Sequence, residues 1–195
     1  KSFPLMPKKL NYISEEVKSS PLFNLLSTDE YEWFYWTNYS RTNPKDFWDS
    51  VVEPVLKNYP NLVSSYTRSL KHDLYSASPL PIIQPNEKLL ILARNHATDL
   101  AKKMAPPSHN STNGKSFQIR MVSAGIENCA AENISFGPSN TILSLVLLYI
   151  DQDLPDLGHR KTLLAASYTQ MGIGIGNYHS SQNIVIQDFA CDQTR

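Results

Sequence analysis

Residues 169–190 read TQMGIGIGNYHSSQNIVIQDFA, and this stretch decides the fold class. Apolar residues alternate with glycines from Met171 to Gly176, and a second, mostly apolar run extends from Asn183 to Ala190 after a polar turn over residues 177–182. Alternation with a period of two is typical of β-strands. The stretch therefore predicts two antiparallel strands joined by a turn.

The Gly-x-Gly-x-Gly series in the first of these strands favours a structural role over a ligand-binding one. A dinucleotide-binding loop needs a strand before its glycines and a helix after them, and that context is missing here. Gly172, Gly174 and Gly176 share one face of the strand, because side chains alternate between the two faces. We therefore expect a helix or another backbone to approach this face closely.

An aromatic-rich helix is predicted to begin after Ser27. Ser27 and Glu30 form a capping-box pattern, and the helix should extend to about Tyr39. Its aromatic side chains cover more than one face, which favours a helix buried on two sides over an aromatic ligand-binding wall. At least one of Trp33 and Trp36 should be nearly fully buried.

Two further helices are predicted before residue 105. One begins at Asn43 and Pro44, and Pro54 should kink or strain it. The next opens near Asn86 with an apolar stripe that includes His96, which we interpret as a hydrogen-bonded core residue rather than a ligand. The stripe consists of Leu89, Ala93, His96, Ala97, Leu100 and Met104.

Three shorter elements are predicted between residues 116 and 150. They are a helix over residues 116–124 closed by Gly125, a brief strand around residues 131–136, and an apolar helix over residues 142–150 capped by Ser139 or Asn140. The last helix is apolar all round, so we expect it to be covered on more than one side. Residues 1–26 are interpreted as an irregular N-terminal arm packed on one domain, residues 27–195.

Composition excludes several classes of partner. The chain has 195 residues with 18 basic and 18 acidic side chains, so it lacks the positive charge on which nucleic-acid binding rests. Its longest apolar run, residues 145–150, is far shorter than the roughly 20 residues of a membrane-spanning helix. We expect a monomeric globular domain with no transmembrane segment. The first residues lack a signal-peptide pattern, as in a processed secreted protein or a trimmed chain.

Residue spacing alone identifies no enzyme. The chain contains no Gly-x-Ser-x-Gly elbow, no His-Glu-x-x-His, no Walker loop and no Cys-x-x-Cys pair. Its two cysteines, Cys129 and Cys191, are too far apart for a local metal knuckle and form either one disulfide or two buried thiols. His109 and His159 stand in polar, turn-like contexts, where a single histidine more often has a surface or structural role.

Four motifs in order carry a resemblance to a known family. They are His109 followed by GKSFQIR at residues 114–120, AENI at residues 131–134, GHRKTLL at residues 158–164 and YTQMGIG at residues 168–174. Over about residues 27–190 the chain resembles the bacterial branch of the CAP superfamily, the cysteine-rich secretory, antigen-five and pathogenesis-related proteins. The resemblance implies an α+β fold, arranged as a three-layer α-β-α sandwich with a mainly antiparallel central sheet. It also implies a secreted or periplasmic location.

The resemblance also implies a central cleft with two histidines and two acidic residues. His109, Glu132 and His159 match three of these positions. The family's second glutamate is missing, and we favour Asp151 over Asp153 in its place. Imidazole and carboxylate ligands suit Zn²⁺ or another divalent cation, so the four residues are the predicted metal site.

Two functions follow from this cleft. We favour a non-catalytic binding module for a lipid, a peptide or a partner surface, because the family has no shared enzymatic activity and the sequence shows no nucleophile with an oriented base. The alternative is a peptidase-like hydrolase in which a metal ion or the His–Glu pair activates water.

A disulfide is expected in this layered fold. Cys129 precedes the Glu-Asn-Ile strand and Cys191 follows the last strand, so a layered sheet would bring the two cysteines together.

Overall fold

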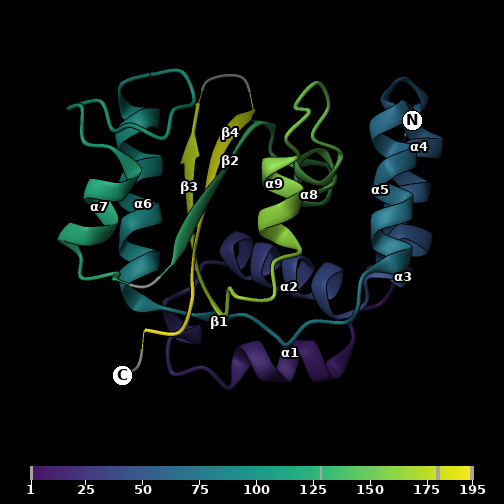
Figure 1. Cartoon of the computed structure of the whole chain (residues 1–195), viewed down its shortest axis with the longest axis horizontal. Coiled ribbons are helices and arrows are strands. Elements are labelled where there is room, and N and C mark those ends of the chain that lie inside the picture. The colour runs from purple at the N-terminus through teal and green to yellow at the C-terminus, as the bar shows by residue number, and fades with distance from the viewer. Residues whose placement is uncertain (1, 128, 179–180, 194–195) are drawn as a thin grey trace.

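The protein is an α+β fold, as the family resemblance implies, with helices on both sides of a four-stranded sheet (Figure 1). The computed structural model describes residues 2–127, 129–178 and 181–193. The helices are α1 (Asn11–Lys18), α2 (Thr28–Thr42), α3 (Pro44–Phe47), α4 (Glu53–Asn58), α5 (Ser65–Ser76), α6 (Glu87–Lys102), α7 (Phe117–Ser123), α8 (Thr141–Ile150) and α9 (Gly158–Leu163).

The sheet is mixed rather than mainly antiparallel. Its strands are β1 (Gln84–Pro85), β2 (Ala130–Pro138), β3 (Gln170–Asn177) and β4 (Gln182–Ala190), in the order β1-β3-β4-β2. β4 pairs antiparallel with β2 and β3, as expected, but β1 pairs parallel with β3. A two-residue strand ending in proline shows no period-two pattern, which is why the sequence did not reveal it. Residues 179–180 of the predicted turn between β3 and β4 lie outside the described residues.

The glycine-rich face of β3 is the contact surface for α6. A Cβ atom at Gly174 would lie 2.1 Å from the carbonyl oxygen of Ala93, and one at Gly172 would lie 2.1 Å from the backbone of Leu89. Real Cβ atoms essentially never approach other heavy atoms within 3.0 Å. The expected close approach of a helix to this strand is therefore confirmed.

Replacing Gly174 by alanine should destabilise the protein by about 2 to 3 kcal/mol, because the added methyl group has no room against the backbone of α6. Gly158→Ala is the matched control, since its Cβ atom would lie 3.5 Å from its nearest neighbour, the Asp156 side chain. Denaturant unfolding of both variants measures the difference. Equal stability of the two variants would contradict backbone contact between α6 and β3.

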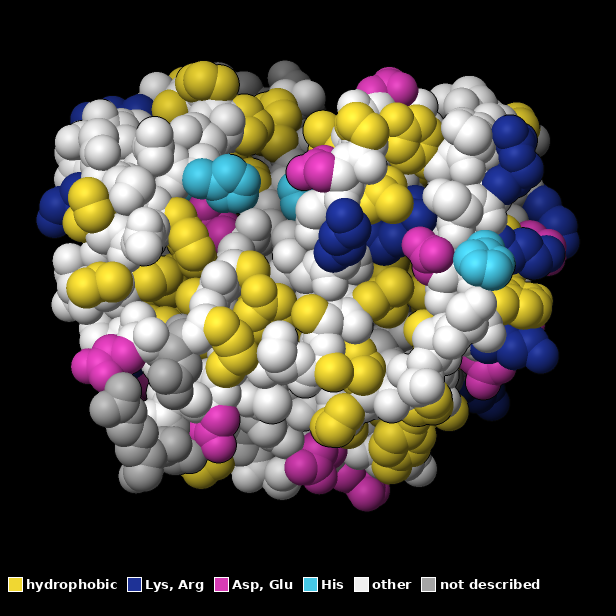
Figure 2. Space-filling model, in the orientation of Figure 1, with side chains coloured by type: hydrophobic (Ala, Val, Ile, Leu, Met, Phe, Trp, Pro, Cys, Tyr) yellow, Lys and Arg dark blue, Asp and Glu magenta, His cyan; other side chains and the backbone are white. Residues whose placement is uncertain are grey.

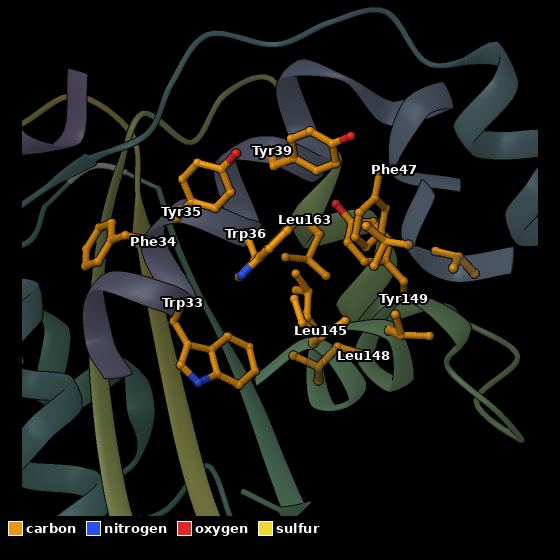
Figure 3. Packing of buried hydrophobic residues seen from close by; sticks show 14 of the residues in the cluster. Trp33, Phe34, Tyr35, Trp36, Tyr39, Phe47, Leu145, Leu148, Tyr149 and Leu163 are labelled. Atoms are coloured by element: carbon orange, nitrogen blue, oxygen red, sulfur yellow. The ribbon is translucent and has the colours of Figure 1, made fainter. Parts of the chain in front are cut away.

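The aromatic residues of α2 form core, not a ligand-binding wall. Ser27 and Glu30 cap this helix reciprocally, as predicted. The side chains of Trp33 and Trp36 are 2% and 5% exposed, so both are buried. Figure 3 shows Trp33 on the same side of α2 as Leu145 and Leu148, whereas Phe34 extends toward the strands.

The predicted helix after Asn43 is interrupted. A π-helical turn over Trp48–Val52 separates α3 from α4, directly before Pro54. Proline has no backbone N–H and its ring crowds the preceding turn, so the regular hydrogen-bond ladder cannot pass through this point. The predicted disturbance of the helix by Pro54 is confirmed.

Two other expectations were wrong. Residues 1–26 are not irregular throughout, because α1 forms there and buries Ile13 and Val17 in the main core. Met104 is not part of the apolar stripe, because α6 ends at Lys102 and Met104 is exposed, with a left-handed φ of 50°.

The remaining predicted elements are present, with small changes of extent. The side chain of Asn140, rather than that of Ser139, caps α8 by accepting a hydrogen bond from the backbone N–H of Leu143, and Gly125 closes α7 with a left-handed φ of 72°. Most residues of α8 are buried, as its all-round apolar character predicts. Within the described residues, none of the helices combines the length and the apolar character needed to cross a bilayer.

The predicted disulfide between Cys129 and Cys191 is confirmed. The two Cα atoms are 5.4 Å apart, and the backbone N–H of Cys191 donates to the carbonyl of Cys129 at 2.9 Å. The bond joins the chain just before β2 to the chain just after β4.

Candidate functional site

Two histidine–carboxylate pairs meet at one cleft. His109 Nδ1 lies 2.8 Å from Glu132 Oε1, and His159 Nδ1 lies 2.5 Å from Asp151 Oδ1. Figure 2 shows histidine side chains on both sides of a hollow in this face, with acidic side chains beside them. The cleft has a volume of about 330 Å³ and is lined by His109, Glu132, Asn133, Leu154, Asp156, Gly158, His159 and Thr162.

Asp151 is positioned by the end of α8. It is the C-cap residue and has a left-handed backbone, with φ of 52°, which turns the chain away from the helix. Its carboxylate accepts hydrogen bonds from both the ring of His159 and the backbone N–H of Arg160. Asp153, the residue we did not favour, instead accepts a hydrogen bond from Gln152.

Glu132 on β2 holds His109 in place together with Arg120. One carboxylate oxygen of Glu132 bonds to His109, and the other accepts from Arg120 Nη2 at 2.5 Å. Arg120 also donates to the backbone carbonyl of His109 at 2.7 Å. Burial acts to raise the pKa of Glu132, but the hydrogen bond with His109 and the charge of Arg120 outweigh it and leave the pKa below its usual value.

His96 lies beside this pair, inside the fold. Its side chain is fully buried, and Nε2 donates to the carbonyl of Ser108 at 2.8 Å, because a carbonyl oxygen can only accept. Burial lowers the pKa of His96, which keeps the ring neutral. The interpretation of His96 as a hydrogen-bonded core residue is confirmed.

Asp188 is a buried acid directly opposite Glu132 in the β2–β4 ladder. Apart from the facing carboxylate of Glu132, neither of its carboxyl oxygens has a hydrogen-bond partner among the described residues. Burial, and then the negative charge of Glu132, raise the pKa of Asp188 well above its usual value. Burial and the neighbouring carboxylate thus favour the protonated form of Asp188 in the folded protein.

Asp188→Asn should make the protein more stable at about pH 7, by about 1.4 kcal/mol for each pH unit over which only the folded wild type holds the proton, because the amide is neutral in both states. The folded pKa lies above the unfolded value of about 3.9, so unfolding releases a proton and wild-type stability falls as pH rises between these two values. Below about pH 4 the two proteins should be equally stable. Denaturant unfolding at both pH values checks this, and a less stable variant at pH 7 would contradict a neutral Asp188.

Arg160 anchors the other rim of the cleft. Arg160 is 1% exposed, and its side chain connects α9 to α5 and α8. Its guanidinium group donates to the carbonyls of Tyr66, Tyr149 and Ile150 and to the side chains of Ser69 and Asp73. His159, the preceding residue, is thereby held on a fixed support.

The four predicted metal ligands form two pairs in the structure. In the part of the chain that the structure describes, no group of three or more His, Cys, Asp or Glu side chains could hold a metal ion. Both oxygens of Glu132 and both oxygens of Asp151 already accept hydrogen bonds. Direct coordination by all four residues stays a prediction.

Comparison with known protein families identifies a match over most of the chain. The model of the CAP family, described as the cysteine-rich secretory protein family, matches residues 34–189. No match was found among curated proteins.

Two solved structures share the fold at low sequence identity. An extracellular protein containing an SCP domain, from Bacillus anthracis, has a TM-score of 0.52 and 19% identity, with 98% of this chain and 45% of that chain covered. Venom allergen-like protein 4 from Schistosoma mansoni has a TM-score of 0.51 and 12% identity, with 87% of this chain and 92% of that chain covered. The present chain thus spans less than half the length of the Bacillus protein.

Proposed function

The chain belongs to the cysteine-rich secretory protein (CAP) family, and from this premise we propose that it is an extracytoplasmic binding protein whose cleft takes up a divalent cation through His109 and His159. One observation carries the proposal: a buried carboxylate holds the Nδ1 atom of each histidine ring, and both rings line the same cleft. The description of the Bacillus protein as extracellular supports the location. We also propose that the sheet and the helices on its two sides form the three-layer α-β-α sandwich of this family.

The two imidazoles suit Zn²⁺ or a similar ion. A carboxylate that accepts from Nδ1–H fixes the tautomer, so that Nε2 carries the lone pair, and makes the ring a stronger ligand. Glu132 and Asp151 would act in this way, behind the histidines rather than on the ion. Bound there, the ion would offer open positions to an oxygen donor of a peptide, a lipid headgroup or a partner protein.

A hydrolase that uses the same cleft is the second candidate. A histidine held by a carboxylate is the arrangement of a general base, which could activate water. Among the described residues, no Ser, Thr or Cys side chain is hydrogen-bonded to the ring of His109 or His159. A protein nucleophile with an oriented base is thus missing from this part of the chain, and we favour binding.

Calorimetric titration with Zn²⁺ at about pH 7.5 and about pH 5.5 tests the proposal. Protons compete with the metal ion for imidazole nitrogen over this range, so affinity should fall by at least about tenfold at the lower pH. His159→Ala should abolish binding, whereas His72→Ala, at an exposed position on α5, should leave it unchanged. Equal affinity at both pH values, or unchanged binding by His159→Ala, would refute the assignment.

A further inference from the structure

A second pocket lies between α6, α7 and the loop that joins them. It has a volume of about 460 Å³ and shares no lining residue with the histidine cleft. Its lining residues come from one face of α6, from α7 and from the loop. They are Leu92, Asn95, His96, Asp99, Ser111, Asn113, Lys115, Arg120, Ser123 and Ala124.

The two buried lining residues have unpartnered polar atoms. His96 Nδ1 and Arg120 Nε are buried, and neither has a hydrogen-bond partner among the described residues. Because Nε2 of His96 donates to Ser108, Nδ1 carries the lone pair and needs a donor, whereas Arg120 Nε–H needs an acceptor. A hydroxyl group both donates and accepts. Such unsatisfied buried groups cost free energy and call for a ligand or a bound water.

The walls of the pocket suit a molecule with several hydroxyl groups. Asn95, Asn113, Ser111 and Ser123 provide amide and hydroxyl groups, each of which donates and accepts. Leu92 and Ala124 add apolar surface, against which the C–H face of a sugar ring can pack.

The charges in the pocket favour a ligand with one negative group. Both carboxylate oxygens of Asp99 accept hydrogen bonds from Thr112, and Arg120 is paired with Glu132 outside the pocket. Lys115, at the exposed end, forms no ion pair with a described residue. Lys115 is therefore the cation of this pocket that remains available to bind a carboxylate.

We infer that this pocket binds a small polyhydroxylated molecule with one carboxylate, of the hexuronic acid type. The hydroxyl groups lie toward His96 and Arg120, and the carboxylate lies toward Lys115. The two sites have different lining residues, and Arg120 connects them, because it bonds to Glu132 and to the backbone carbonyl of His109.

Titration of the ¹⁵N-labelled protein with D-glucuronate, followed by NMR shifts of the backbone amides, tests the inference. Saturable shifts are expected at the lining residues of α6 and α7, with a dissociation constant of the millimolar order typical of small ligands with weak binding energy. D-Glucose, which lacks the carboxylate, should bind about tenfold more weakly, as expected for the loss of one charged hydrogen bond.

Matched variants locate the binding. Ser123→Phe should fill the pocket and abolish the shifts, whereas Val122→Phe, at the adjacent and 66% exposed position, should retain them. Lys115→Gln should remove the preference for glucuronate over glucose, and Lys161→Gln on α9 should not. The amide spectrum of each variant away from the pocket shows whether it is folded. Absence of saturable shifts, shifts that survive in folded Ser123→Phe, or equal binding of the two sugars would overturn the inference.

Discussion

Replacing Trp33 by alanine is expected to lower the free energy of unfolding by about 3 to 5 kcal/mol, the usual cost of removing a buried tryptophan side chain. Trp33 is 2% exposed and belongs to the main core, which joins α2 to α8 and the sheet. The surrounding side chains come from different elements, so the core cannot collapse around the missing ring without moving whole helices (Figure 3).

Urea unfolding followed by circular dichroism measures this loss. Leu5→Ala is a suitable control, because Leu5 is 96% exposed and its truncation should change stability by less than about 0.5 kcal/mol. If Trp33→Ala were as stable as the control, the aromatic face of α2 would be an open ligand-binding surface, the alternative that its sequence pattern left possible.

Loss of the disulfide is expected to cost about 4 kcal/mol. Cys129 and Cys191 are 62 residues apart, and in the chain-entropy model the bond stabilises the fold by restricting the unfolded chain in a loop of this length. The double variant Cys129→Ser/Cys191→Ser removes the bond while it keeps the size of both side chains nearly unchanged.

Wild-type protein treated with reductant should unfold at the same denaturant concentration as the double variant, because both lack the same bond. Oxidised wild type should require clearly more denaturant than either. Equal midpoints for the oxidised protein and the double variant would mean that the bond contributes nothing to stability and that the sheet alone holds its two ends together.

Local sequence signals predicted most of the fold, because their physical causes are local. The capping box at Ser27 and Glu30, the cap at Asn86 and the glycine at 125 each act within one helical turn. The glycines of β3 predicted a close packing partner, although only the structure identifies α6 as that partner.

The elements that were missed carry weaker signals. The sequence of α5 gives only a weak helix pattern, because its buried side chains are limited to Thr67, Leu70 and Leu74. Its capping box pairs Ser64 with Thr67, in place of the usual Glu or Gln, so the common pattern for a helix start is absent. α1 lies between the prolines of residues 1–26, and these prolines favoured the interpretation of an irregular segment.

Family motifs identified the histidines and acids of the candidate site, but not how they pair. The contact between His159 and Asp151 depends on the left-handed end of α8, and that between His109 and Glu132 depends on Arg120. Both contacts depend on how separate elements are arranged in space, which the spacing of residues in the sequence does not encode. A single clue for Asp188 was available: it is an acid within an otherwise largely apolar strand.

The central position of β4 has a consequence for hydrogen exchange. Its backbone is paired on both sides, with β2 and β3, and α6 covers it as well as β3. Amide protons of β4 should therefore exchange with solvent only when the whole domain opens, so that their rates report global stability in a single native sample. His109, in the exposed loop after α6 and on the wall of the cleft, should exchange much faster, so the cleft opens locally while β4 stays closed.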